Sequence, residues 1–163
     1  MRHPETYLQK ILTKEQARQQ VNHWHMLGQT VVFTNGVFDL LHEGHLFSLG
    51  QAAKEGTKLI VAINSDASVK RLKGSERPIQ SQTTRSQIIA ALVFVDAVIV
   101  FEEDTPAELI EFIEPDVLVK GGDYKPEQIA GAESVLKRGG KVIINPILEG
   151  HSTTHTISRL KKY

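Results

Sequence analysis

The stretch TVVFTNGVFDLLHEGH, residues 30–45, joins an apolar segment rich in β-branched residues to a loop that contains glycine and two histidines. The apolar segment is typical of a strand that is buried on both faces of a sheet. Gly36 permits a positive φ or the close approach of another group to the backbone. His42 and His45 stand where a helix is expected to begin, so we expect both side chains to face one pocket.

The same change from strand to helix recurs along the chain. Short apolar segments alternate with amphipathic ones, and Thr13 with Gln16 forms a capping-box pattern at the first of the helices. This alternation predicts an α/β, Rossmann-like three-layer sandwich with a five-stranded parallel sheet. We expect one domain over residues 1–163, with residues 1–30 as an N-terminal helical extension. The expected strands are 30–35, 58–64, 97–101, 116–120 and 141–145, and the expected helices are 13–27, 46–55, 66–72, 83–94, 106–113, 127–138 and 153–162.

The composition excludes several classes of protein. The 163 residues include no cysteine, which rules out disulfides and thiolate metal sites. No apolar run is long enough to span a membrane, and the polar N-terminus lacks a secretory signal, so we expect a cytoplasmic protein. Lysine plus arginine equals aspartate plus glutamate at 19 each, a balance that does not favour nucleic acid as a partner. The acidic segment 101–116 is interpreted as solvated surface, whereas the basic segment 70–77 is a candidate anion site.

Polar and glycine residues follow nearly every expected strand. Parallel sheets of this kind bind ligands at the carboxyl ends of their strands, near the point where the strand order reverses. In the first loop, the two imidazoles and the amides of a helix N-terminus suit the oxygens of a polyphosphate. Zinc is a poor alternative because no third or fourth ligand follows at a familiar spacing. A dinucleotide-dependent oxidoreductase is also disfavoured, since no G-x-G-x-x-G follows the first strand.

His42-Glu43-Gly44-His45 matches the HxGH motif. By this motif the chain resembles the HxGH nucleotidyltransferase superfamily. The segments TNGVFDLLHEGH, VAINSDASVKRLKG, ERPI, FEEDTP, DVLVKGGDYKPEQIAG and STT together resemble the D-glycero-β-D-manno-heptose 1-phosphate adenylyltransferase domain of ADP-heptose synthase. That resemblance implies transfer of an adenylyl group from ATP to the sugar phosphate, on the route to lipopolysaccharide. It also implies Mg²⁺ bound mainly through the ATP phosphates. Val37 and His151 stand where the family commonly has cysteine.

The resemblance, taken with the residues that follow the strands, assigns roles within the site. Asp39 could instead be a buried carboxylate bonded to backbone amides, Arg85 a structural pair, and Ser152 to Thr154 an ordinary helix cap. Lys73 is favoured over Lys70 for the attacking phosphate. The expected catalytic residues are His42, His45 and Lys73; the expected nucleotide-binding residues are Asn35, Gly36, Val37, Phe38, His42, His45, Lys120, Gly121, Asp123, Ser152, Thr153 and Thr154; the expected substrate-binding residues are Asp39, Asp66, Lys70, Lys73, Arg77 and Arg85.

Alternatives and partners follow from the same resemblance. A cytidylyl- or guanylyltransferase acting on another sugar or polyol phosphate remains open, as does a nucleotide sensor without turnover. We expect ATP and a sugar 1-phosphate as ligands, a homodimer, and a heptose kinase that is a separate protein. No metal site made by the protein alone is expected.

Overall fold

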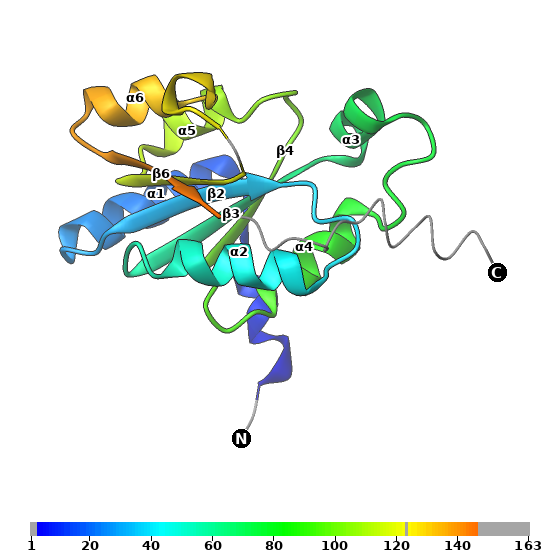
Figure 1. Ribbon diagram of the computed structural model, residues 1–163. Coiled ribbons are helices and arrows are strands. Elements are labelled where there is room, and N and C mark those ends of the chain that lie inside the picture. Colours follow the sequence, from blue (N-terminus) through cyan, green and yellow to red (C-terminus); the bar gives the residue numbers. More distant parts are fainter. Residues whose placement is uncertain (1–2, 123, 147–163) are drawn as a thin grey trace.

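A computed structural model describes residues 3–122 and 124–146, and in these residues six parallel strands form one sheet (Figure 1). The strand order is β1-β4-β3-β2-β5-β6. The expectation of five strands is therefore wrong. The additional strand, β1, has two residues that pair with β4 at Val98 and Ile99, and it is too short to leave a periodic pattern in the sequence. The strands are β1 (Ile11–Leu12), β2 (Val31–Gly36), β3 (Lys58–Asn64), β4 (Ala97–Phe101), β5 (Val117–Gly121) and β6 (Lys141–Asn145).

The helices between the strands lie close to their expected positions. Thr13 and Gln16 form the expected capping box, with each side chain bonded to the other residue's backbone amide at 3.2 and 2.9 Å. The helix expected over 127–138 is wrong in its first half, because Gly131, at a φ of 85°, separates a short 3₁₀ turn from the helix proper. The helix expected over 153–162 lies outside the described residues. The helical elements are η1 (Pro4–Lys10), α1 (Lys14–Met26), α2 (Glu43–Ala53), α3 (Asp66–Lys73), α4 (Gln82–Ala90), α5 (Ala107–Ile113), η2 (Pro126–Gln128) and α6 (Ala132–Lys137).

Two hydrophobic cores cover the two faces of the sheet, which confirms the three-layer arrangement. Figure 1 shows α5 and α6 on one side of the sheet and α2 on the other. Successive strand residues alternate between the cores: Val31 and Phe33 pack with α1, α5 and α6, whereas Val32 packs with α2 and α4. Burial on both faces explains why the central strands are apolar throughout.

Residues 11–26 take part in this architecture directly. β1 extends the sheet at its edge, and Val21 and Trp24 of α1 are buried against one face. Within the described residues, no helix combines the length and the apolar character that crossing a bilayer requires.

The sheet order places the functional site. β2 lies between β3 and β5, so the chain moves outward from β2 in one direction to β3 and β4 and in the other to β5 and β6. The strand order reverses at this point, and the loops at the carboxyl ends of β2, β3 and β5 therefore border a crevice.

Candidate active site

A cavity of about 460 Å³ lies at the carboxyl ends of β2, β3 and β5. Loops after these strands, the loop after β4 and the end of α3 form its walls. Five of the residues expected to bind nucleotide or substrate line it: Asn35, Gly36, Val37, Lys73 and Lys120. The carboxyl ends of the parallel strands thus bring together residues that are up to 85 positions apart in the chain, as in the hydrogen bond from Lys120 to Asn35.

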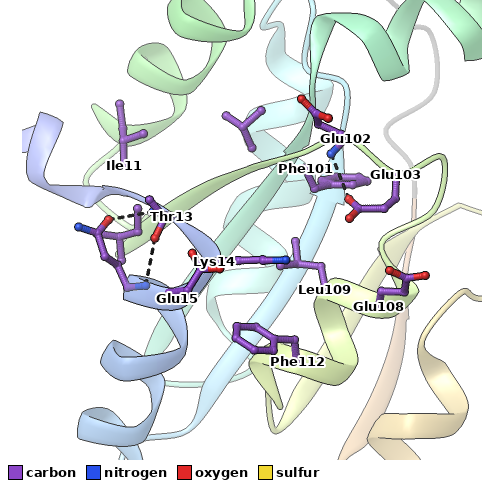
Figure 2. Close-up of a pocket in the computed structure, with 13 residues that line it drawn as sticks. Ile11, Thr13, Lys14, Glu15, Phe101, Glu102, Glu103, Glu108, Leu109 and Phe112 are labelled. Atoms are coloured by element: carbon purple, nitrogen blue, oxygen red, sulfur yellow. Dashed lines mark hydrogen bonds between the residues drawn. The ribbon is translucent and has the colours of Figure 1, made fainter.

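A larger cavity of about 750 Å³ lies nearer the edge of the sheet, between the start of α1 and α5. Figure 2 shows Glu102, Glu103 and Glu108 at its border, with Lys14 among them. The Lys14 ammonium lies 5.8 Å from the centre of the Phe112 ring. A mouth dominated by carboxylates repels phosphate, so this cavity is not a polyphosphate site.

The two histidines of the HxGH motif lie together at the start of α2. His42 is the N-cap residue of the helix, and the backbone amide of His45 donates to its carbonyl at 2.9 Å. Their rings are stacked with 3.7 Å between centroids and 20° between planes. The two rings thus lie together, but neither histidine is among the residues that line the 460 Å³ cavity, and the expectation that both face one ligand pocket stays a prediction. The edge of the Phe38 ring contacts His45, with 5.2 Å between ring centroids.

Burial and neighbouring charge act strongly on His45. Burial, together with the charges of His42 and Lys73, lowers the pKa of His45 from 6.5 to about 4, while a hydrogen bond with the backbone of Leu40 opposes them. Within the described residues, Nδ1 of His45 is buried and has no hydrogen-bond partner. The ring is therefore neutral at pH 7 and retains an unused polar atom. An anion placed beside it would raise its pKa by favouring the protonated form.

Lys120 supplies a half-buried cation to the cavity. Its Nζ donates to Oδ1 of Asn35 at 3.2 Å, and burial lowers the pKa of Lys120. No carboxylate of the described residues lies within 4.0 Å of this ammonium group. A half-buried ammonium without a counterion favours the binding of an anionic ligand.

The carboxylate of Asp39 makes its hydrogen bonds within the protein itself. Asp39 is 1% exposed, and its carboxylate accepts hydrogen bonds from the amides of Ile79 and Gln80 and, at 2.6 Å, from Nε of Arg77. Burial raises the pKa of Asp39, but the two backbone amides and the Arg77 guanidinium outweigh that effect and hold it below its usual value. The carboxylate therefore fixes the loop 77–80, which was the alternative interpretation of this residue. Nη2 of Arg77 is buried without a partner among the described residues.

Arg85 is also enclosed by protein. Its side chain is fully buried, and it donates to Oδ1 of Asp66 at 2.8 Å and to the carbonyls of Val37 and Gln80 at 2.7 and 3.0 Å. Lys70, one turn before Lys73 on α3, is exposed, as Lys73 is, but Lys73 lines the cavity and Lys70 does not. Gly121 faces α2, where a Cβ atom would come within 3.0 Å of Oγ of Ser48.

Some of the expected residues lie outside the described part of the chain. These are Asp123, Ser152, Thr153 and Thr154. Within residues 3–122 and 124–146, no three histidine, aspartate or glutamate side chains are grouped as a metal site.

Several residues of the cavity wall were not expected from the sequence. Asp104 and Thr105 follow β4, within the acidic segment that was interpreted as solvated surface, and the strand-end rule applied to β4 would have found them. Tyr124 and Gln128 come from the loop after β5, where sequence reasoning stopped at Asp123.

Comparisons with known proteins agree with this geometry. The profile of the cytidylyltransferase-like family matches residues 33–158. The bifunctional protein HldE of Gluconobacter oxydans is 50% identical over 147 residues, which are 90% of this chain and 31% of the relative. HldE of Klebsiella pneumoniae is 51% identical over 152 residues, 93% of this chain and 32% of the relative. The chain thus spans about a third of the length of these curated relatives.

Two solved structures resemble the chain. A lipopolysaccharide core biosynthesis protein from Thermoplasma volcanium is 31% identical with a TM-score of 0.60, and the match covers 76% of this chain and 100% of that one. A pantoate-beta-alanine ligase from Francisella tularensis has a TM-score of 0.60 at 16% identity, covering 93% of this chain and 76% of that one, and shows the fold alone.

Proposed function

Because this chain belongs to the cytidylyltransferase-like family, we propose that it joins ATP to D-glycero-D-manno-heptose 1-phosphate, giving ADP-heptose and pyrophosphate. The observation that carries the proposal is the cavity at the switch point of the sheet, where Lys73 and Lys120 line the wall, together with the stacked histidines at the start of α2. The identity to HldE proteins over nearly the whole chain supports the choice of sugar.

The reaction requires little covalent chemistry from the protein. An oxygen of the sugar phosphate attacks the α-phosphorus of ATP, the bond from that phosphorus to the bridging oxygen breaks, and pyrophosphate leaves with the electron pair. The nucleophile is already an anion, so no general base is needed. Catalysis then consists of holding two polyanions together and stabilising the charge of the transition state.

The described residues divide into two anion-binding groups. His42 and His45, with the amides at the start of α2, suit the ATP phosphates, and we assign His45 to the charge that develops near the α-phosphate. Lys73 and Lys120 line the cavity, which is bordered by the hydrogen-bonding side chains of Asn35, Asn64 and Gln128. A pocket that combines cations with amide groups suits a phosphorylated sugar. The charge of Lys73 is one of the causes that lower the pKa of His45, which supports one shared site for the two groups.

Magnesium fits this scheme as part of the nucleotide. Since no cluster of acidic or histidine ligands forms among the described residues, we propose that Mg²⁺ enters on the ATP phosphates and keeps much of its water shell. It neutralises phosphate charge, while the histidines and lysines orient the two reactants.

A panel of substrates tests the proposal. The purified chain is mixed with ATP, CTP or GTP, Mg²⁺ and either heptose 1-phosphate, another hexose 1-phosphate or glycerol phosphate, and pyrophosphate release is measured. We expect the highest kcat/KM for ATP with heptose 1-phosphate. Preference for CTP with a polyol phosphate would refute the proposed substrates and indicate a cytidylyltransferase. Binding of ATP without release of pyrophosphate from any pair of substrates would indicate a nucleotide sensor.

A further inference from the structure

The fully buried guanidinium of Arg85 joins three segments that surround the active site. Nη1 donates to the carbonyl of Val37 in the loop after β2, at 2.7 Å. Nη2 donates to Oδ1 of Asp66, the first residue of α3, at 2.8 Å. Nε donates to the carbonyl of Gln80, in the loop between α3 and α4, at 3.0 Å. One side chain therefore holds a segment that precedes the histidines and the helix that carries Lys73.

Asp39 holds the same loop from the opposite direction. Its carboxylate accepts from the amides of Ile79 and Gln80, at 2.8 and 2.9 Å, and from Nε of Arg77. Gln80 is thus bonded through its carbonyl to Arg85 and through its amide to Asp39. The loop after β2, the start of α3 and the loop 77–80 form one connected unit.

A second contact fixes the start of α3. The backbone amide of Asp66 donates to Oε1 of Gln82 at 2.9 Å, and Gln82 is the first residue of α4, the helix that also carries Arg85. α3 is therefore attached to α4 at its first residue by two separate hydrogen bonds. Its other end, at Lys73, lies at the wall of the cavity.

The length of α3 converts small rotations into large displacements. From Asp66 to Lys73 the helix rises by about 10 Å, so a tilt of about 6° at its start moves Lys73 by about 1 Å. A displacement of about 1 Å of a reacting group can lower a rate by about 100-fold. The contact between Arg85 and Asp66 thus lies where it controls the distance from Lys73 to the histidine pair.

We propose that Arg85 is a positioning residue that sets the separation between the sugar-phosphate group held by Lys73 and the ATP phosphates held by His42 and His45. The proposal rests on the function proposed above. Arg85 touches neither reactant, because its side chain is fully buried and its three nitrogens face protein oxygens. It acts through Asp66 and Val37.

Arg85→Ala and Arg85→Lys test this role, with Arg18→Ala as the matched control. Arg18 donates to the carbonyl of Ile113 and to the carboxylate of Glu114, and it lies on α1 away from the site. For Arg85→Ala we expect kcat/KM for the sugar phosphate to fall by about 100-fold. The affinity for a non-hydrolysable ATP analogue is expected to change by less than about threefold, because none of the three hydrogen bonds of Arg85 goes to α2, which carries His45. A lysine reaches fewer of the three acceptors, so Arg85→Lys is expected to lie between the wild type and Arg85→Ala.

Two further readouts separate positioning from folding. Guanidinium ion at tens of millimolar is expected to restore part of the activity of Arg85→Ala and to leave Arg18→Ala unchanged, since it can fill the vacated site. Hydrogen exchange at the amides of Ile79 and Gln80 is expected to be faster in both Arg85 variants than in the control. The exchange measurement does not depend on turnover.

The outcomes distinguish this proposal from the proposed function. A wild-type protein that releases no pyrophosphate refutes the function, and the exchange rates then decide whether Arg85 holds the loop and α3. If the wild type turns over and Arg85→Ala retains its kcat/KM for the sugar phosphate within about threefold, the positioning role is overturned. Equal losses in ATP affinity and sugar-phosphate kinetics, without rescue, would also overturn it.

Discussion

The rings of His42 and His45 are stacked at 3.7 Å, a separation at which two protonated imidazoles would repel each other strongly. The second charge becomes favourable only when an anion lies beside the pair. We therefore expect the stacked pair at the start of α2 to respond as a unit to a bound phosphate.

Because the two histidines act as a unit, their substitutions are expected to be non-additive. His45→Ala should lower kcat by about 100- to 1,000-fold, the usual loss when one donor to a transition-state oxyanion is removed. In the double variant with His42→Ala, the fold-loss in kcat should be smaller than the product of the two single fold-losses. Steady-state kinetics of the four proteins give the coupling, with His23→Ala, an exposed residue of α1, as the control. Fully multiplicative losses would show that the rings act independently.

The buried position of His45 predicts a pH-dependent stability. Its pKa is lowered from 6.5 to about 4, so above pH 6.5 the ring is neutral in both the folded and unfolded chains and its contribution to stability is fully present. As the pH falls from 6.5 toward 4, the unfolded chain takes up a proton that the folded chain excludes. The free energy of unfolding should fall over this range by less than about 3 kcal/mol, because solvent screens part of the effect at a ring that is only partly buried.

Urea titrations at several pH values check this expectation. His45→Gln should remove the decrease between pH 6.5 and 4, whereas His23→Gln should retain it. Identical slopes for the wild type and His45→Gln in this window would contradict the assigned pKa.

Local patterns predicted most of the architecture. Apolar strands, the capping box at Thr13 and the glycines that end helices depend on neighbours in sequence, and they were read correctly. β1 was missed because its two residues become a strand only through pairing with β4. The helix around Gly131 was placed too early because a positive φ at that glycine interrupts the amphipathic pattern.

The functional site divides in the same way. His42 and His45 were recognisable because they lie three positions apart at a helix start, a local arrangement. Asp39 and Arg85 were assigned to substrate, but their partners lie about 40 to 50 residues away in the chain, at Ile79, Gln80 and Val37. A sequence shows a charged residue without showing whether the protein itself satisfies the charge.

Gly36 and Gly50 should respond to alanine in opposite ways. A Cβ atom at Gly36 would lie 2.9 Å from the Phe38 ring, which contacts His45, so Gly36→Ala should cost about 1–3 kcal/mol and lower activity as the ring shifts. At Gly50, inside α2, no atom lies within 4 Å of the added carbon. Gly50→Ala should therefore raise the free energy of unfolding, by about 1 kcal/mol at most. Thermal unfolding and pyrophosphate release measure both. A Gly36→Ala variant with wild-type stability and rate would refute the close packing.

Lys73 and Lys70 should differ although they lie on the same helix. Lys73 lines the cavity and Lys70 does not, so Lys73→Ala should raise KM for the sugar phosphate by about 10- to 100-fold, the loss of one charge-assisted hydrogen bond. Lys70→Ala should change this KM by less than about threefold, because Lys70 does not line the cavity and its charge acts on the ligand only through screening solvent. Initial rates at saturating ATP measure this difference, with Lys54→Ala on α2 as a further control. Equal effects of the two substitutions on KM would indicate that the whole basic segment 70–77 binds the sugar phosphate.

Asp39→Asn should destabilise the protein strongly. An amide cannot accept hydrogen bonds at both of its ends, so it would face the donors of Arg77, Ile79 and Gln80 with a donor of its own and leave Arg77 without its counterion. Breaking a buried ion pair on one side typically costs about 3–5 kcal/mol. Urea unfolding at pH 7 measures the loss, and Asp104→Asn, which removes an exposed pair with Arg71, should cost less than about 1 kcal/mol.

The acid dependence of the same variant completes the test. The pKa of Asp39 is held below its usual 3.8, so its contribution to stability is full above that pH and is lost as the pH falls through the lowered value. The wild type should therefore lose stability below pH 3.8 more steeply than Asp39→Asn, in a range separate from that of His45. If Asp39→Asn unfolds within about 1 kcal/mol of the wild type at pH 7, the loop 77–80 is held by other contacts and not by this carboxylate.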